Sequence, residues 1–369
     1  MKKVAIVINT SWNIYNFRMN LLKRLQKEGM EVIAIAPEDA YSKHLTEAGF
    51  TYVPVEMQSS GANPFHELIV LYQLYKAYKK HKPDAVLHFT IKPNLYGSVV
   101  ARLLGIPSIN NVSGLGTAFL QNNLVAKVAR KLYRFAFKSP SKVFFQNEDD
   151  RRLFVKFNLV KPQITEVIPG SGVDLNRFSP NGVQPKGQPF TFLMISRVLY
   201  DKGIKEYAEA IAMLKNKGVN ARFQLLGATD PGHRSGVALE QLEAWQKEGL
   251  LEYLGTTDDV KPYIKNAHCI VLPSYREGTP RTLLEASGLA KPLVATDVPG
   301  CNNIVTDNKN GYLCKVKDSQ DLADKLHKMY SLSPEDLQKM GKEGRNIVEQ
   351  RFDENIVIER YLNAIHEVV

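Results

Sequence analysis

The sequence alternates between short apolar runs and helical patterns, and this alternation limits the folds open to it. In the first half, the apolar runs lie at residues 4–8, 31–36, 51–55, 85–89, 108–111, 143–146 and 166–168. Segments with helical periodicity separate them, at residues 17–29, 65–81, 95–104 and 124–137. Such an alternation predicts a parallel sheet wrapped by helices.

A second alternating series follows a stretch rich in Gly and Pro. Its apolar runs lie at residues 190–195, 222–226, 251–254, 269–273, 293–296 and 312–315. A chain of 369 residues is too long for one ordinary core. We therefore predict an α/β protein with two doubly wound domains. The expected parts are a first domain at 1–170, a linker at 171–189, a second domain at 190–352 and a final segment at 353–369.

Cysteine usage and hydropathy indicate the compartment. The three cysteines, Cys269, Cys301 and Cys314, form no C-x-x-C motif, which favours a reducing environment without structural disulfides. The apolar run at the N-terminus is short and turns polar at Asn9, as expected for a buried first strand and not for a signal peptide. No stretch approaches the roughly 18 apolar residues of a membrane span. We expect a cytoplasmic protein that contacts membranes only peripherally.

The positive charge belongs to the first half. Residues 1–180 hold 24 Lys and Arg against 13 Asp and Glu, whereas residues 181–369 hold 24 against 25. The densest basic residues follow helical spacing along one side of the segment 127–138: Lys127, Arg130, Lys131, Arg134 and Lys138. Such a helix, or a second one at 72–82, suits an anionic membrane surface; an ordinary solvated face is the alternative. Nucleic acid is not expected, because the aromatic residues are spaced like core positions and no nucleic-acid module is present.

Two glutamates eight residues apart, Glu277 and Glu285, indicate a ligand site. They flank the expected start of a helix, with Thr279 as its N-cap and Pro280 at its first position. Free N–H groups and the positive dipole end at a helix start suit a phosphate or a sugar hydroxyl. A carboxylate on each side could accept hydrogen bonds from two polyol rings, as a nucleotide-sugar site requires. In the alternative interpretation, Glu277 caps the turn and Glu285 is a solvated helix residue.

Four segments carry a family resemblance in their order and spacing: 196–203, 255–260, 274–285 and 298–301. Together they resemble the retaining glycosyltransferases of family 4, the group 1 glycosyl transferases. Shorter matches are similar to a branch of bacterial enzymes that extend undecaprenyl-diphosphate-linked sugars, at residues 14–15, 17–19, 63–65, 92–94, 114–116 and 353–355.

The resemblance implies the GT-B architecture, two Rossmann-like domains facing a cleft, with a final helix at 355–367 that returns to the first domain. It also implies catalytic roles for three side chains: Arg197 and Lys202 would stabilise the departing diphosphate, and Glu277 would hold hydroxyls of the donor sugar. Glu285 would bind the ribose hydroxyls of the nucleotide. The intervening residues would approach the sugar and phosphate, namely Gly278, Thr279, Pro280, Arg281 and Thr282. Retention of configuration follows from family membership, with the departing phosphate taking the acceptor's proton.

Candidates for the acceptor side lie in the first half: Asn13, Tyr15, Arg18, His88, Lys92 and Asn94. Arg18 is expected near the start of a helix, where it would contact an acceptor diphosphate or form a surface salt bridge. His88 would line the cleft or be a satisfied core histidine. The sequence departs from the family pattern at Ser113, where many members carry histidine, and at Asn303, where glutamate is frequent.

No motif for a metal or a redox cofactor is present. The sequence contains no D-x-D pair and no H-E-x-x-H spacing, so protein cations must supply the charge and no metal is expected. A dinucleotide-binding protein is disfavoured, because Gly114-Leu115-Gly116 lacks the third glycine and no glycine follows the first strand.

These observations predict a glycosyltransferase that moves a sugar, expected to be an N-acetylhexosamine, from a UDP-sugar to a polyprenyl-diphosphate-linked saccharide. It would act peripherally on the anionic cytosolic face of the inner membrane, in surface glycan biosynthesis. The alternatives are a soluble transferase with a small-molecule or protein acceptor, a non-catalytic nucleotide-sugar-binding scaffold and a nucleotide-sugar epimerase.

Overall fold

The computed structural model describes residues 1–58, 64–114, 124–180 and 189–369. The described chain divides into two compact units, one made of Met1–Ser171 with Asn355–Val369 and the other of Gly172–Glu354. Among the described helices, none is both long and apolar enough to cross a bilayer. The matched segment at 114–116 and the predicted linker lie partly outside the described ranges.

Unit 1 is built on a seven-stranded parallel sheet in the order β3-β2-β1-β4-β5-β6-β7. Its strands are β1 (Lys3–Val7), β2 (Glu31–Ala36), β3 (Thr51–Pro54), β4 (Ala85–Phe89), β5 (Ser108–Val112), β6 (Lys142–Phe145) and β7 (Thr165–Val167). Its helices are α1 (Ser11–Lys27), α2 (Ser42–Glu47), α3 (Pro64–His81), the π-helix η1 (Pro93–Gly97), α4 (Ser98–Leu104), α5 (Leu124–Ala136), α6 (Glu148–Lys156) and α13 (Glu354–His366), with a short 3₁₀ turn η3 (Pro162–Ile164).

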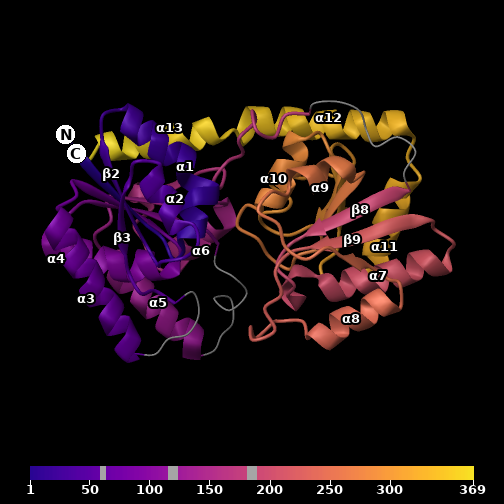
Figure 1. Cartoon of the computed structure of the whole chain (residues 1–369), viewed down its shortest axis with the longest axis horizontal. Helices are drawn as coiled ribbons and strands as arrows, with labels where there is room; N and C mark the ends of the chain where they lie inside the picture. The colour runs from indigo at the N-terminus through magenta and orange to yellow at the C-terminus, as the bar shows by residue number, and fades with distance from the viewer. Residues whose placement is uncertain (59–63, 115–123, 181–188) are drawn as a thin grey trace. The chain divides into compact units, whose positions relative to one another are not determined.

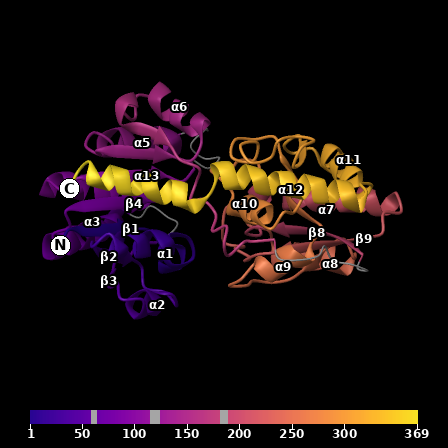
Figure 2. The ribbon, with the colours of Figure 1, turned by 90° about the horizontal axis from the view of Figure 1, so that it is seen from above.

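Helices cover both faces of this sheet (Figure 1). One core joins β1 and β4 to α1 and α13, and the cores on the opposite face join the sheet to α3, α4 and α5. Figure 2 shows α13 lying over the middle of the sheet. Its Tyr361 hydroxyl accepts a hydrogen bond from Asn111 Nδ2 on β5 at 2.5 Å. The final segment of the chain is therefore part of unit 1.

Unit 2 repeats the design with a six-stranded parallel sheet in the order β10-β9-β8-β11-β12-β13. Its strands are β8 (Phe190–Ile195), β9 (Ala221–Leu226), β10 (Glu252–Tyr253), β11 (Cys269–Leu272), β12 (Leu293–Thr296) and β13 (Gly311–Cys314). Its helices are η4 (Tyr200–Lys202), α7 (Ile204–Asn216), α8 (Leu239–Lys247), α9 (Lys261–Asn266), α10 (Arg281–Gly288), α11 (Ser319–Tyr330) and α12 (Pro334–Arg351).

The helices of unit 2 also form two layers. The core on one face joins the sheet to α7, α8 and α11, and the core on the other face joins it to α9, α10 and α12. The start of the predicted linker packs into the second core, because Val173 and Phe178 are buried there. The Val173 amide donates to the Phe352 carbonyl at 2.8 Å, which fixes the start of this unit to its end. The predicted pair of doubly wound parallel sheets is confirmed.

Candidate active site

The site lies where the strand order of unit 2 reverses. The next strand after β8 in the chain, β9, pairs with β8 on one side. β11 pairs with β8 on the other side, and β12 lies beyond β11. A crevice opens at such a switch point, outside the carboxyl ends of the strands, and ligands bind there. The loops that follow β8 and β11 carry Lys202 and Glu277.

Lys202 and Glu277 form an ion pair at this switch point. Lys202 Nζ donates to Glu277 Oε1 at 2.5 Å, and the two side chains are only 21% and 14% exposed. Removing one partner of a pair shielded in this way leaves an unpaired charge, which costs more than breaking a surface pair. The resemblance assigned one residue to the diphosphate and the other to the sugar, and the structure places them in direct contact.

Backbone contacts hold Lys202 in place. Gly203 follows it with φ at +76°, and a Cβ there would lie 2.1 Å from the Pro273 carbonyl oxygen. Only glycine combines that conformation with so close an approach. The Tyr275 amide also donates to the Asp201 carbonyl at 3.0 Å. The loop after β8 is therefore fastened to the loop after β11.

A third loop, after β12, supports Glu277 from behind. The Glu277 amide donates to the Pro299 carbonyl at 3.3 Å. Gly300 has φ at +92°, and a Cβ there would lie 2.6 Å from the Glu277 carbonyl oxygen. Asn303 Oδ1 accepts from the Gly300 amide at 2.9 Å, so the residue that departs from the family pattern fixes this loop. Burial, and then the charge of Glu277, raises the pKa of the Cys301 thiol.

Helix α10 begins one residue later than predicted. Pro280 is its N-cap, with ψ at 116°, and its carbonyl accepts from the Leu283 amide at 3.1 Å. The expected arrangement, with Thr279 as N-cap and Pro280 inside the helix, is wrong, because Pro280 keeps extended geometry. The side chain of Thr282 donates to the Ile195 carbonyl at 3.1 Å, which ties the start of α10 to the end of β8.

Glu285 is held by a neighbour on the same helix. Arg281 Nε and Nη2 both donate to Glu285 Oε1, at 3.0 and 2.8 Å. Glu285 is only 8% exposed, so it is not the solvated helix residue of the alternative interpretation. The i, i+4 spacing that produces this contact is visible in the sequence, although the family resemblance implies only a ligand contact for Arg281.

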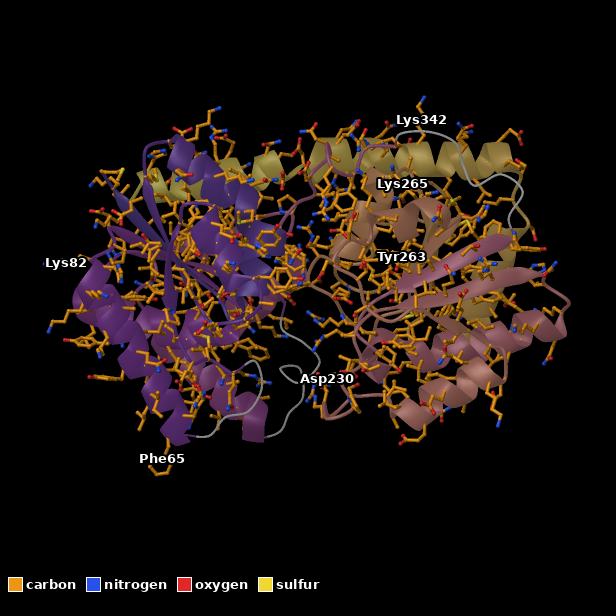
Figure 3. The ribbon with its side chains drawn as sticks, viewed as in Figure 1. Phe65, Lys82, Asp230, Tyr263, Lys265 and Lys342 are labelled. Carbon is orange, nitrogen blue, oxygen red and sulfur yellow. The ribbon has the colours of Figure 1, made fainter. Side chains whose placement is uncertain are left out.

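Arg197 occupies a more open position than Lys202. Its side chain is 58% exposed and Nη1 lies 4.0 Å from Asp230 Oδ2, on the loop after β9 (Figure 3). The distance is at the limit of an ion pair, and exposure weakens such a contact. Arg197 therefore presents a largely exposed guanidinium at the carboxyl end of β8.

Two acceptor-side candidates of unit 1 are core residues. His88 is fully buried; its Nε2 lies 2.8 Å from Tyr78 Oη and its Nδ1 lies 2.9 Å from Asn110 Oδ1. Burial lowers the pKa of His88 to about 4. Asn94 is 1% exposed and donates to the Asn111 carbonyl at 2.7 Å. The expectation that His88 lines the site is wrong, because strand alternation turns it into the core.

Arg18 lies in the middle of α1 and not near its start. Thr10 caps that helix by accepting from the Asn13 amide at 3.1 Å. Arg18 is 6% exposed, with its guanidinium carbon 4.4 Å from the centre of the Phe89 ring, so it is a buried residue and not one on the helix surface. Tyr15 is partly exposed and lies against the rings of Tyr41 and His44.

Lys92 is paired beside the carboxyl end of β4. Its Nζ donates to Glu67 Oε1 at 2.6 Å, and both side chains are largely shielded from water. Ser113, at the end of β5, donates to Asn111 Oδ1 at 3.0 Å. These side chains lie at the carboxyl edge of the unit 1 sheet, which is the edge where ligands generally bind in doubly wound folds.

The basic residues of α5 fall into two groups. Lys127, Lys131 and the following Lys138 are exposed. Arg130 packs its guanidinium carbon 4.4 Å from the centre of the Phe157 ring. Arg134 donates to the Phe157 carbonyl at 3.0 Å. Three lysines therefore present their charges to solvent, whereas the two arginines contact the loop after α6.

Among the described residues, no group of three or more His, Cys, Asp or Glu side chains is arranged to hold a metal ion. The cations at the candidate site are instead Lys202, Arg197 and Arg281, and each has an acidic neighbour. This donor set fits a ligand with both phosphate and hydroxyl groups.

Comparisons with known proteins show the family of the chain. Residues 177–347 match the family model of group 1 glycosyl transferases, and residues 3–147 match a glycosyl transferase 4-like model. The chain is 31% identical, over all of its length and 99% of the relative's, to N,N'-diacetylbacillosaminyl-diphospho-undecaprenol α-1,3-N-acetylgalactosaminyltransferase of Campylobacter jejuni. It is 27% identical to UDP-Gal:α-D-GlcNAc-diphosphoundecaprenol α-1,3-galactosyltransferase of Escherichia coli, over 67% of this chain and 66% of that one.

Solved structures share the fold. A glycosyltransferase from Rickettsia africae superimposes with a TM-score of 0.79 at 19% identity, covering 100% of this chain and 98% of that one. Anabaena HepE, solved in complex with UDP and glucose, superimposes with a TM-score of 0.81 at 17% identity, covering 99% of each chain. The fold class is thus GT-B, as predicted. With this fold, both family models and the full-length similarity in agreement, the chain belongs to the group 1 glycosyl transferases and is a hexosyltransferase.

Proposed function

We propose that this chain transfers an N-acetylhexosamine, with retention of configuration, from a UDP-sugar to a polyprenyl-diphosphate-linked saccharide. The observation that carries the proposal is the shielded pair of Lys202 and Glu277 at the switch point of unit 2. Similarity along the full length to a C. jejuni enzyme named for a diphospho-undecaprenol acceptor supports the acceptor class.

Each side chain has a task in this reaction. The bond between the anomeric carbon and the β-phosphate oxygen breaks, and Lys202 and Arg197 neutralise the charge that grows on the departing UDP. Fixed donors aimed at such charge typically lower a barrier by a few kcal/mol. Glu277 accepts hydrogen bonds from donor-sugar hydroxyls, and Glu285 accepts from the ribose hydroxyls. The acceptor hydroxyl bonds to the anomeric carbon on the same face, and its proton passes to the departing phosphate.

The reaction would need no metal ion. The leaving group is neutralised by side chains already positioned at the carboxyl end of β8, and the N–H groups at the start of α10 add partial positive charge. We further propose that the enzyme works peripherally on the cytosolic face of the inner membrane, because its acceptor is anchored there and unit 1 carries the positive charge.

A calorimetric titration tests the donor class. UDP, GDP and ADP are each titrated into the protein in EDTA, and UDP is also titrated into the Glu285→Ala variant. We expect UDP to bind selectively, without metal, and to lose affinity in the variant. Equal binding of all three nucleotides, or binding indifferent to Glu285, would contradict the assignment of α10.

Transfer assays test the acceptor class. Labelled UDP-N-acetylhexosamines are incubated with a diphospho-undecaprenol-linked saccharide or with soluble saccharides. Product on the lipid-linked acceptor supports the proposal. Transfer only to a soluble acceptor would favour a soluble transferase. Conversion of the donor sugar without an acceptor would indicate an epimerase, and nucleotide binding without turnover would indicate a scaffold.

A further inference from the structure

The outward face of α3 is apolar along its first half. Leu68, Ile69 and Tyr72 are 63%, 46% and 61% exposed, and Phe65 near the helix start is 80% exposed. The opposite face of the helix packs on the sheet through Val70, Leu74, Ala77 and Tyr78. The helix is therefore apolar on both faces over this stretch, although only one face is needed for the core.

The second half of the same outward face is basic. Lys76, Lys79 and Lys80 are exposed. At 100° per residue, these lysines and the four apolar residues fall within about 120° of one another around the helix. Figure 3 shows Phe65 and Lys82 at the two ends of α3, with Phe65 projecting away from unit 1. One stripe thus runs from an apolar end to a basic end.

Aromatic rings connect the two halves of the stripe. Lys76 Nζ lies 5.6 Å from the centre of the Tyr72 ring, and Lys79 Nζ lies 5.5 Å from the centre of the Tyr75 ring. A groove of about 590 Å³ runs beside them, lined in part by Val53, Pro54 and Tyr75. Tyrosine and lysine side chains each have an apolar body and a polar tip, so they suit the boundary between the acyl chains and the headgroups of a membrane.

Helix α5 presents a similar surface from the same layer. It covers the same face of the sheet as α3 (Figure 1). Its Val128, Leu132 and Phe135 are 48%, 43% and 50% exposed. The exposed Lys127 and Lys131 flank them at helical spacing. Two helices of one layer therefore combine outward apolar residues with lysines.

We propose that α3 is the membrane-docking helix of this enzyme: the ridge of Phe65, Leu68, Ile69 and Tyr72 inserts among the acyl chains, and Lys76, Lys79 and Lys80 bind anionic headgroups. The occupant is a lipid bilayer because the apolar block adjoins a cluster of one charge sign, which an anionic surface complements. Helix α5 supplies a second contact. This inference rests on the proposed lipid-linked acceptor, whose sugar must be reached at the membrane surface.

The inward face of α3 links the ridge to the acceptor side. Glu67, one residue before Leu68, turns inward and accepts from Lys92 Nζ at 2.6 Å. Lys92 follows β4, at the sheet edge where ligands bind in this fold. Docking through the ridge would therefore bring the membrane within about one helix diameter of an acceptor-side candidate.

Flotation with vesicles tests the inference without donor or acceptor. Vesicles of phosphatidylcholine, with and without phosphatidylglycerol, are mixed with the protein and with two variants. The ridge variant carries Leu68→Gln, Ile69→Gln and Tyr72→Gln, and the basic variant carries Lys76→Gln, Lys79→Gln and Lys80→Gln. Glutamine keeps good helix propensity. Leu239→Gln on α8 is the matched control, because Leu239 is 45% exposed.

We expect the ridge variant to lose affinity for both vesicle types by about tenfold or more, because apolar burial drives insertion. The basic variant should lose only the preference for phosphatidylglycerol, and the Leu239→Gln control should float like the unchanged protein. Circular dichroism and urea unfolding of each variant verify that the fold is kept. An unchanged affinity in the ridge variant would overturn the inference.

A tryptophan introduced at position 69 distinguishes a membrane from a protein partner, provided that the chain's own Trp12 and Trp245 are first replaced by phenylalanine so that the new residue is the only indole. The Ile69→Trp fluorescence should shift to the blue and be quenched by brominated acyl chains, whereas that of Leu239→Trp should not. If light scattering finds dimers that the ridge variant abolishes, the ridge is a self-association surface and the inference fails. Vesicle binding and transfer are measured separately, so failure of transfer alone contradicts the proposed function and not the docking.

Discussion

Lys202 Nζ lies 2.5 Å from Glu277 Oε1, although 75 residues separate them in the chain. Each residue belongs to a different loop at the carboxyl edge of the unit 2 sheet, and those loops meet because β8 pairs with β11. The two charges are paired with each other in the structure. A bound diphosphate would take over Lys202, and donor-sugar hydroxyls would take over Glu277.

Replacing Lys202 should affect turnover more than binding. In Lys202→Ala we expect kcat to fall by about a hundredfold or more, because a fixed cation near the leaving group is lost. The dissociation constant for UDP should change less. Initial rates and calorimetry measure the two effects. Lys205→Ala is the control, since Lys205 is exposed on α7. An unchanged kcat would remove Lys202 from the leaving-group role.

Arg281 should act through Glu285. Its two hydrogen bonds fix a carboxylate that is nearly buried. We expect Arg281→Gln to weaken UDP binding by about tenfold, as loss of a shielded charge-assisted contact does. Arg281→Lys should restore part of the affinity. Calorimetry measures both, with the exposed Arg222→Gln as control. In the Glu285→Ala background Arg281→Gln should have little further effect, and two additive losses would contradict the coupling.

Gly300 and Gly218 form a matched pair for testing the loop behind Glu277. Both have positive φ, at +92° and +75°, so alanine strains the backbone at either position. A Cβ at Gly218 has open space, whereas one at Gly300 would lie 2.6 Å from the Glu277 carbonyl oxygen. We expect Gly300→Ala to lose most transfer activity and Gly218→Ala to keep it. Similar activity in both variants would show that the loop does not position Glu277.

Acid should destabilise unit 1 through His88. Burial lowers the folded-state pKa of His88 to about 4, below the ordinary histidine value of 6.5. Between these values the unfolded chain binds the proton and the folded chain does not. The free energy of unfolding therefore decreases as the pH falls from 6.5 to about 4, by up to about 3 kcal/mol.

Urea unfolding at several pH values measures this effect. His88→Gln removes the titrating group, so its stability should depend less on pH in that window, although the lost contacts lower stability throughout. His44→Gln changes an exposed histidine and should keep the slope of the unchanged protein. Parallel slopes for all three proteins would contradict the burial argument.

Several features could be predicted from the sequence because they depend on local order. Apolar runs between helical patterns predicted both parallel sheets. Glu277 and Glu285 were placed on either side of a helix start, which holds although α10 begins at Arg281. The one-residue error arose because the φ angle that the proline ring fixes is compatible with both the first helical position and the residue before it, so only the ψ angle of Pro280 separates the two.

The orientation of individual side chains was harder to predict. His88 lies within β4, a strand that is buried on both faces. The alternation of side chains along such a strand does not show whether a given residue points into the core or toward a ligand site. Arg18 is buried against Phe89, although an arginine on a helix is usually exposed. The basic segment at 72–82 was predicted to suit an anionic surface, but the exposed apolar residues before it, Phe65, Leu68 and Ile69, were not assigned to that surface. The sequence does not show which face of this helix meets the sheet.

The sequence by itself determined the secondary structure, the concentration of positive charge in the first half and the residue types at the candidate site. Those properties follow from near neighbours along the chain. Tertiary structure decided the contacts of those residues, above all the pairing of Lys202 with Glu277 and the support of Glu277 by the Gly300 loop. The physical reason is that strand order brings distant loops to one sheet edge, and the strand order arises from packing in three dimensions.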